Sequence, residues 1–237
     1  MTTLILLFSL PWLFLSTNVG AQKKSEMTST FKIVNIKEDF PIGEIDHQFW
    51  QKAKEVTIDK YWSGKKAPTG RQFKAKLLWS ETALYVRFEA NQAEPLVISD
   101  APDLSSKTIG LWDRDVCEIF LAPNAKEFRK YFEFEVAPTG EWIDLAVYQM
   151  RNKRITDREY SSGMKTSALI EKDKIWIALK IEWKAFGKTP KAGEIWKGNL
   201  FRCLGEGETR GYLAWQATKT DQPNFHVPAA FGNFEFE

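Results

Sequence analysis

The sequence predicts an all-β protein: an antiparallel β-sandwich, of the jelly-roll or immunoglobulin-like kind, with one or two short helices. First, apolar and polar residues alternate with a period of two from residue 73 onward, as in half-buried antiparallel strands. Second, about a dozen such short runs follow one another without the helices that a parallel βαβ sheet needs. No repeat or low-complexity linker divides the chain, so we expect residues 22–237 to form one domain.

Residues 1–21 are expected to be a removable export signal. Leu4–Leu15 is almost wholly apolar but too short to span a bilayer comfortably, and Val19-Gly20-Ala21 offers a small-residue cleavage site. The first three residues lack the usual basic side chain, which leaves a retained anchor as the alternative. No second long apolar run follows, so we expect a secreted, periplasmic or cell-surface protein without a membrane span after cleavage.

Three runs show the alternation most clearly, and each predicts a strand. In Ala83–Ala90 and Arg129–Val136 the apolar face carries even-numbered residues, whereas in Lys174–Trp183 it carries odd-numbered ones. Further strands are expected at Phe31–Lys37, Phe73–Trp79, Val116–Leu121, Glu141–Tyr148, Gly163–Ile170, Ile195–Leu204, Tyr212–Ala217 and Phe231–Glu237.

Turns, short helices and two long loops connect these strands. The Pro-Thr-Gly sequence at 138–140 predicts a tight hairpin. Asp46–Ala53 begins with an N-cap residue and predicts a short helix, and Trp183–Gly187 predicts one further turn. Asn91–Gly110 and Arg151–Gly163 are expected to be irregular loops at the rim of a site, because long loops in compact domains are often functional.

The composition favours a protein that recognises apolar or ring-shaped surfaces over one that binds nucleic acid. The net charge is +2, from 33 basic and 31 acidic residues that are well mixed, without the clustered Lys and Arg of a nucleic-acid footprint. The 10 Trp, 6 Tyr and 17 Phe exceed what a core of this size usually needs. Cys117 and Cys203 are the two cysteines, and both a disulfide and two buried thiols remain open.

The ten residues from Trp112 to Leu121 carry the strongest functional signal. Glu118 lies inside an otherwise apolar strand, where an unpaired carboxylate is costly to bury. The indole of Trp112 can cover the apolar face of a pyranose ring, and the Glu118 carboxylate can accept hydrogen bonds from its hydroxyls. A core tryptophan followed by a strand-edge acid is the alternative interpretation.

Several motifs, taken in order along the chain, resemble carbohydrate-binding module family 9 and its family-9-like relatives. They are Asp46…Trp50-Gln51-Lys52-Ala53, residues 83–88, 112–120 and 131–140, then Gly193…Trp196…Asn199-Leu200-Phe201-Arg202, Trp215, and Phe225-His226-Val227-Pro228…Phe231-Gly232. The resemblance covers most of the mature chain.

This resemblance implies a β-sandwich that grips sugars, often the reducing ends of plant-wall glucans and xylans, between two tryptophan rings. It implies Trp112 and Trp215 as the two walls and Glu118 as the hydroxyl acceptor, with polar contacts from Arg202, Tyr131 and Glu133. A glycoside hydrolase is the implied partner, and no cofactor is expected apart from a structural calcium. Asp103, Asp113 and Asp115 offer hard oxygen ligands for such an ion, although no EF-hand spacing accompanies them.

Arg202 and Glu118 are also expected to form an ion pair. Each is costly to bury alone, and each has a cysteine as its neighbour in its strand. Because side chains alternate between the faces of a strand, the two charges would share the ligand face while Cys117 and Cys203 share the core.

The expected function is that of an exported, non-catalytic carbohydrate-binding module that supports carbohydrate catabolism. One alternative is a glycoside hydrolase that uses Glu118 with Glu133 or Glu135 as its pair of carboxyl groups. Another is a structural domain of the cell surface that has kept the fold without binding sugar.

Overall fold

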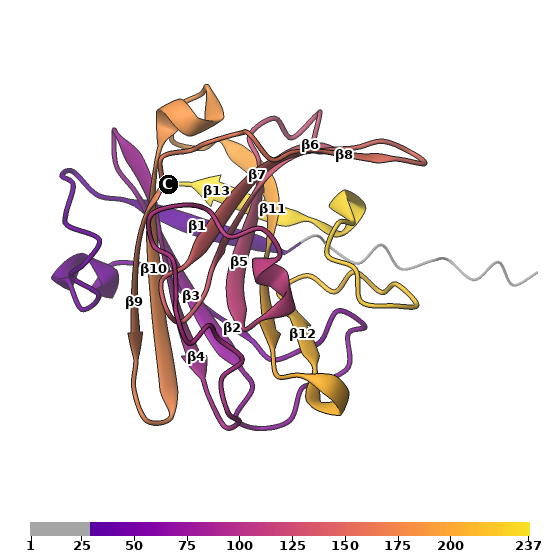
Figure 1. Ribbon diagram of the computed structural model, residues 1–237. Helices are drawn as coiled ribbons and strands as arrows, with labels where there is room; N and C mark the ends of the chain where they lie inside the picture. Colours follow the sequence, from indigo (N-terminus) through magenta and orange to yellow (C-terminus); the bar gives the residue numbers. More distant parts are fainter. Residues whose placement is uncertain (1–28) are drawn as a thin grey trace, which may run out of the picture.

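Thirteen strands form one sheet that curls over on itself into two packed layers, as the computed structural model of residues 29–237 shows (Figure 1). The expected export signal, residues 1–21, lies outside the described residues. The strands are β1 (Thr30–Asn35), β2 (Glu55–Ile58), β3 (Phe73–Trp79), β4 (Ala83–Asn91), β5 (Val116–Ala122), β6 (Lys130–Val136), β7 (Trp142–Gln149), β8 (Arg154–Asp157), β9 (Lys165–Ile170), β10 (Lys174–Glu182), β11 (Ile195–Leu204), β12 (Gly211–Ala214) and β13 (Gly232–Phe236). Short 3-10 helices lie at η1 (Gln48–Gln51), η2 (Leu111–Asp113), η3 (Trp183–Phe186), η4 (Gly207–Thr209) and η5 (Pro228–Ala230).

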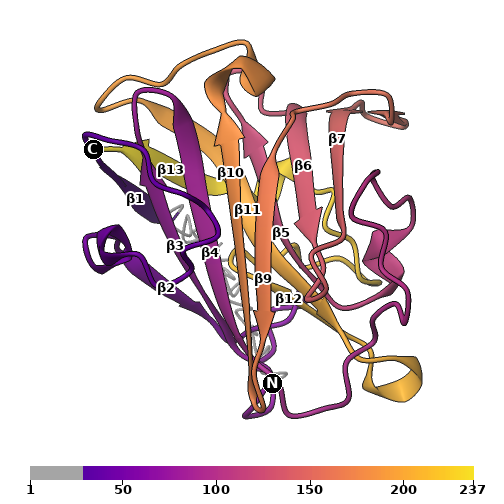
Figure 2. The same cartoon turned by 60° about the vertical axis from the view of Figure 1, so that its left-hand side comes forward.

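The first layer has the strand order β8-β7-β6-β5-β11-β13, with β12 paired to β11. The second layer has the order β3-β4-β10-β9, with β2 paired to β3. In Figure 2 the second layer lies in front of the first. Strand β1 joins the layers, because Thr30–Ile33 pair with β13 whereas Val34 and Asn35 pair with β3.

The predicted β-sandwich is confirmed, with one difference in strand direction. Every pairing is antiparallel except those of β1, which runs parallel to both β13 and β3. A hairpin forces its two strands to be antiparallel, but β1 reaches neither partner through a hairpin, so a parallel pairing is open to it. Within residues 29–237, no helix is long and apolar enough to cross a membrane.

Two strands and the form of the first helix differ from the sequence-based expectations. β8 lies within the segment 151–163, which we expected to be a loop, and β2 was not expected. Both are four residues long and lie at the sides of the sheet, and β8 is largely exposed, so neither shows a clear apolar alternation. The helix expected at Asp46–Ala53 is reduced to η1, and His47, rather than Asp46, caps it through Nδ1.

The main core lies between the two layers, where the apolar faces of the strands meet. Phe134 and Val136 of β6 point into it, as their alternation predicts, and so do Trp196 and Phe236, whose ring centroids are 5.1 Å apart. The opposite face of β4 is also buried, because Phe40 stacks on Tyr85 at 4.4 Å. That strand is therefore covered on both sides instead of being half-buried.

Gly198 marks the closest approach of strands in the first layer. A Cβ atom at this position would lie 2.1 Å from the carbonyl oxygen of Phe120 and 2.6 Å from the ring of Phe234. Only a residue without a side chain fits there, which locks β11 tightly between β5 and β13.

Candidate functional site

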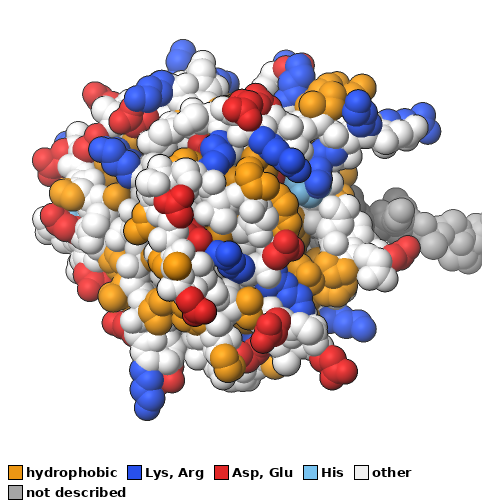
Figure 3. All heavy atoms as spheres, viewed as in Figure 1, with side chains coloured by type: hydrophobic (Ala, Val, Ile, Leu, Met, Phe, Trp, Pro, Cys, Tyr) orange, Lys and Arg blue, Asp and Glu red, His pale blue; other side chains and the backbone are white. Residues whose placement is uncertain are grey.

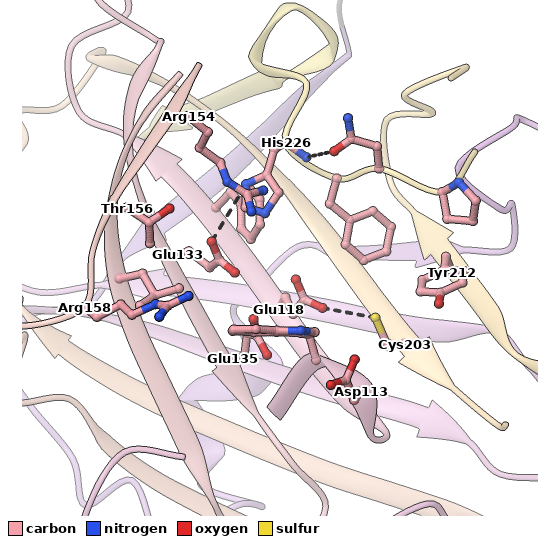
Figure 4. Close-up of a pocket in the computed structure, with 16 residues that line it drawn as sticks. Asp113, Glu118, Glu133, Glu135, Arg154, Thr156, Arg158, Cys203, Tyr212 and His226 are labelled. Atoms are coloured by element: carbon pink, nitrogen blue, oxygen red, sulfur yellow. Dashed lines mark hydrogen bonds and ion pairs between the residues drawn. The ribbon is translucent and has the colours of Figure 1, made fainter. Parts of the chain in front are cut away.

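A pocket of about 330 Å³ opens on the outer face of the first layer, away from the main core. In Figure 1 the β7–β8 hairpin and the loop before β13 extend on the same side of the molecule, and both contribute to the pocket. Its lining includes three buried carboxylates, the rings of Trp112, Phe120, Tyr212, Phe225 and His226, and the polar side chains Arg154, Thr156 and Arg158 (Figure 4). The volume is at the lower end of the range of roughly 300–1,000 Å³ that is usual for small-molecule sites.

Strand register brings the three carboxylates together. Glu118 of β5 lies directly opposite Glu135 of β6, and Glu133 lies opposite Phe120. Opposite residues of an antiparallel pair share a face, so Glu118, Glu133 and Glu135 project from the same side of the sheet. We call these three residues the carboxylate cluster. Figure 4 shows their side chains pointing toward one another.

The carboxylate cluster is deeply buried and has few hydrogen-bond donors. Glu118 is 2% exposed, Glu133 3% and Glu135 0%. The Cys203 thiol donates to Glu118 Oε1 at 3.3 Å, whereas neither oxygen of Glu135 has a hydrogen-bond partner among the described residues. Burial, with the nearby charge of Glu133, raises the pKa of Glu118 to about 8. Burial and the charges of the other two carboxylates raise the pKa of Glu135 well above its usual value.

His226 lies beside the cluster without neutralising it. Its Nδ1 atom is 3.9 Å from Glu133 Oε2, but burial and the charge of Arg154 lower the pKa of His226 to about 3. The ring is therefore neutral near pH 7, and the contact is not an ion pair. Nδ1 also lies 2.8 Å from the Tyr131 hydroxyl, which is suited to donate a hydrogen bond to it. Tyr131 itself is buried behind the pocket and holds His226 in place.

Trp112 stands at the rim on the short helix η2. Gly110 precedes the helix with φ of +86°, a left-handed conformation that favours glycine. The Arg210 guanidinium donates to the carbonyl oxygens of Trp112, Arg114 and Gly205. These bonds fix the backbone that carries the indole, which remains partly exposed.

Trp215 does not join Trp112 in this pocket. It stacks on Phe234, with ring centroids 5.3 Å apart, and lines a separate depression. Tyr212 pairs with Cys203 and therefore faces the pocket, whereas Trp215, three residues further on, points to the other side. The second aromatic side chain at the pocket rim is thus Tyr212, which the sequence analysis missed.

The expected ion pair between Arg202 and Glu118 is wrong. The register of β5 and β11 places Arg202 opposite Cys117, and Phe201 opposite Glu118, so the two charges lie on opposite faces. Arg202 is 1% exposed and does not line the pocket. It donates instead to backbone and side-chain oxygens in the interior: Arg71 O at 3.0 Å, Asn91 O at 2.7 Å and Gln92 Oε1 at 2.6 Å.

The same register separates the two cysteines. Cys203 shares the pocket face with Glu118, and Cys117 points into the main core. Both are buried free thiols. The expectation that they would share the core is therefore wrong, and side chains on opposite faces cannot form a disulfide.

The three aspartates considered for calcium do not converge. Asp103 is exposed and accepts hydrogen bonds from Ser105 and Ser106. Asp115 is buried and accepts from the Gly205 amide at 2.8 Å, and Asp113 lines the pocket. Among residues 29–237, the carboxylate cluster is the group of at least three such side chains whose ligand atoms come within 4.8 Å of one another.

Strand β8 supplies residues that the sequence analysis did not assign to the site. Arg154 and Thr156 of this edge strand, and Arg158 directly after it, are spaced by two residues and line the pocket (Figure 4). Polar residues spaced by two are typical of one face of a strand, but these lie in a segment that we expected to be a loop. On the face seen in Figure 3, acidic and basic side chains are interspersed, in keeping with the mixed charges of the sequence.

Comparisons with solved structures support this fold. A Bacteroides uniformis protein to which carbohydrate binding is ascribed superposes with a TM-score of 0.71 at 17% identity, over 89% of this chain and 100% of its own. A family 9 carbohydrate-binding module from Caldicellulosiruptor kristjanssonii, in complex with cellotriose, gives a TM-score of 0.63 at 18% identity, over 88% of this chain and 94% of its own. Its complex with glucose gives 0.60 at 19% identity, over 87% and 95%.

Sequence comparison identifies the family directly. No curated protein matches the sequence significantly. The profile of the carbohydrate family 9 binding domain-like proteins matches residues 43–237, which is most of the chain and includes the whole pocket. The chain therefore belongs to the carbohydrate family 9 binding domain-like proteins.

Proposed function

We propose that the pocket binds a saccharide without cleaving it. The observation that carries this proposal is the combination, in one cavity, of two partly exposed rings with a floor of oxygen acceptors. Trp112 and Tyr212 can cover the apolar face of a sugar ring, and the carboxylate cluster can accept hydrogen bonds from its hydroxyls. A cavity of about 330 Å³ suits one or two sugar units of an oligo- or polysaccharide.

The arrangement of the carboxylates favours binding over hydrolysis. Glycoside hydrolases place two carboxyl groups on either side of the scissile bond, roughly 5 Å or more apart. Here the three carboxyl groups converge from the neighbouring strands β5 and β6 on one floor of the pocket, so they lie on one side of a bound ligand and do not flank it. Family membership and a family 9 module solved with cellotriose and glucose support a saccharide ligand.

The proposal includes the setting in which the domain works. An export signal at residues 1–21 would place it outside the cytoplasm, where it would hold a carbohydrate for a separate glycoside hydrolase during catabolism. The domain would bind the carbohydrate through aromatic stacking and hydrogen bonds to its carboxyl groups, and the hydrolase would cleave it.

The test is titration calorimetry of the mature protein with glucose, cello-oligosaccharides and xylo-oligosaccharides. Trp112→Ala should weaken binding about 5- to 150-fold, because a buried aromatic contact contributes about 1–3 kcal/mol. Trp176→Ala is the matched control, since Trp176 is a partly buried indole on β10 in the second layer. Equal affinities in the wild type and Trp112→Ala would contradict the proposed site.

An activity assay separates the proposal from the enzymatic alternative. We expect no release of reducing ends from any oligosaccharide that binds. Release by the wild-type protein that disappears in Glu118→Gln would establish a glycoside hydrolase and overturn the binding-module proposal.

A further inference from the structure

We infer that the pocket selects an acidic saccharide, and that Arg154 and Arg158 bind the carboxylate of its uronic acid unit. This inference rests on the proposed function and names the class of sugar. Both arginines line the same pocket as Trp112 and the carboxylate cluster. Figure 4 shows them, together with Thr156, along one side of that cluster. We call Arg154 and Thr156 of β8, with Arg158 directly after it, the β8 wall.

Strand order separates the β8 wall from the carboxylate cluster by one intervening strand. Strand β7 lies between β8 and β6, and hydrogen-bonded strands are about 4.8 Å apart, so β8 lies about 10 Å from β6. On β7, Leu145 lies opposite Glu133 and lines the pocket. A sugar unit over Leu145 can therefore present its ring hydroxyls to the cluster on one side and an exocyclic group to the β8 wall on the other.

The guanidinium groups of the β8 wall have no anionic partner within the described chain. Among residues 29–237, neither Arg154 nor Arg158 forms an ion pair or donates a hydrogen bond through its side chain. In contrast, Arg114 pairs with Glu141 at 2.9 Å. Both side chains of the β8 wall are exposed, so a ligand in the pocket can reach their charges.

The acidic residues of the pocket do not neutralise the β8 wall. Burial raises the pKa of Glu133, and the more distant charge of Arg154 offsets only part of that rise. Burial likewise raises the pKa of Glu118 to about 8, so the cluster retains protons near pH 7. Asp113 belongs to η2, which leads into β5, three strands away from β8. The pocket is therefore polarised, with its positive side at the β8 wall.

A carboxylate suits these donors better than a hydroxyl does. A guanidinium group presents parallel N–H donors that match the two oxygens of a carboxylate, whereas a sugar hydroxyl carries no charge to pair with it. The hydroxyl of Thr156, between the two arginines in sequence, can donate one more hydrogen bond. A hexuronic acid carries its carboxylate outside the ring, so this group can contact the β8 wall while the ring hydroxyls face the cluster.

The backbone of the β8 wall is fixed before a ligand binds. Strand β8 pairs with β7 over its whole length. Beyond its end, the Lys107 ammonium donates to the Arg158 carbonyl oxygen at 3.2 Å, and the Glu159 amide donates to Asp157 Oδ1 at 2.9 Å. Binding therefore needs to order only the arginine side chains, which keeps its entropic cost low.

The first experiment compares sugars that differ only in the exocyclic group. The mature protein is titrated by calorimetry with glucose and glucuronate, and with galactose, galacturonate and galactose 6-sulfate, as free sugars and as short oligosaccharides. We expect each uronate to bind about tenfold more tightly than its neutral partner at about 20 mM salt, and less selectively at about 500 mM salt, because exposed charges are screened.

The outcomes separate this inference from the proposed function. Equal affinities for the uronates and their neutral partners overturn the inference and retain the proposed function. Galactose 6-sulfate that binds as tightly as galacturonate overturns the assignment to a carboxylate, because the pocket would then select charge alone. A protein that binds none of these sugars, and no cello- or xylo-oligosaccharide, overturns the proposed function itself.

Variants of the β8 wall locate the selectivity. Arg154→Gln and Arg158→Gln should each lower the ratio of uronate to neutral affinity, and the double variant should bring it to about one. Arg158→Lys keeps the charge without the paired donors and should lose part of the ratio. Arg151→Gln is the matched control, since Arg151 is an exposed arginine of the same hairpin that does not line the pocket.

The melting temperatures of these variants show whether they fold, and exposed side chains should leave them close to the wild-type value. An unchanged ratio in the folded double variant overturns the role of the β8 wall. A double variant that loses acidic and neutral sugars to the same extent overturns it as well, because the arginines would then contribute to binding without selecting a carboxylate.

Discussion

Replacement of Arg202 by methionine should destabilise the protein strongly, and the loss should not depend on Glu118. Methionine keeps most of the aliphatic volume but leaves three acceptors without their donor: Arg71 O in a buried hydrogen bond, and Asn91 O and Gln92 Oε1 in partly buried ones. An unsatisfied buried acceptor costs about 1–3 kcal/mol. The buried acceptor bears this full cost, and each partly buried hydrogen bond contributes about 0.5–1.5 kcal/mol, so we expect a net loss of about 2–5 kcal/mol.

Urea unfolding of a double-mutant cycle measures this effect and its cause. Arg202→Met is combined with Glu118→Gln in one cycle and with Gln92→Ala in another. The losses for Arg202 and Glu118 should add within about 0.5 kcal/mol, because the two side chains lie on opposite faces of the sheet. Arg202 and Gln92 share a hydrogen bond of 2.6 Å and should couple by about 1 kcal/mol or more.

The opposite pattern of coupling energies would contradict the strand register. Strong coupling of Arg202 to Glu118, with none to Gln92, would mean that β5 and β11 pair in another register. A small loss in Arg202→Met alone would mean that water or rearranged donors satisfy the three acceptors.

Three further changes test the packing and the site. Trp215→Ala should lower the melting temperature but leave the saccharide affinity of a folded sample unchanged, in contrast to Trp112→Ala, because Trp215 lines a separate depression. Gly198→Ala should prevent folding at 37 °C or lower the melting temperature sharply, as seen by circular dichroism, since its Cβ would lie 2.1 Å from the Phe120 carbonyl oxygen. Burial opposes ionisation of Asp39, but hydrogen bonds from two hydroxyls and a lysine outweigh the effect of burial and hold the pKa of Asp39 below 3.8. The ionised carboxylate therefore stabilises the folded protein above that pH, and this stabilisation is lost as the pH falls through the lowered pKa. Wild-type unfolding free energy should therefore decline more steeply below about pH 4 than that of Asp39→Asn.

Alternation in the sequence predicted the strands that pack one face on the main core. It did not predict strands that have no face packed on this core. Ala83–Ala90 and Lys174–Trp183 alternate clearly because every second residue packs between the layers, and they correspond closely to β4 and β10. β8 lies at an edge, and Ile155, its one large apolar residue, is 46% exposed. An exposed edge strand has no need of alternation, so nothing in its sequence distinguished it from a loop.

The candidate site could be predicted in part, because residue chemistry is visible in a sequence and register is not. Glu118 attracted notice as an acid within an apolar strand, and it lies on the pocket floor. Its relation to Arg202 depends on how β5 pairs with β11, where a slip of one residue would reverse which side chains share a face. The expectation that Trp215 faces Trp112 failed for the same reason, since the pairing of β12 with β11 places Tyr212 at the pocket and turns Trp215 away from it.

The position of β1 has a consequence for the folding pathway. Thr30 pairs with Asn233, so the strand that joins the two layers is completed only when the last strand of the chain is present. Such long-range pairing carries a high entropic cost of loop closure and slows folding. Until β13 arrives, an edge of β1 remains open and available to other chains. During synthesis β13 therefore acts as the closing step of the sheet, and a chain that lacks β13 should aggregate more readily than the intact one.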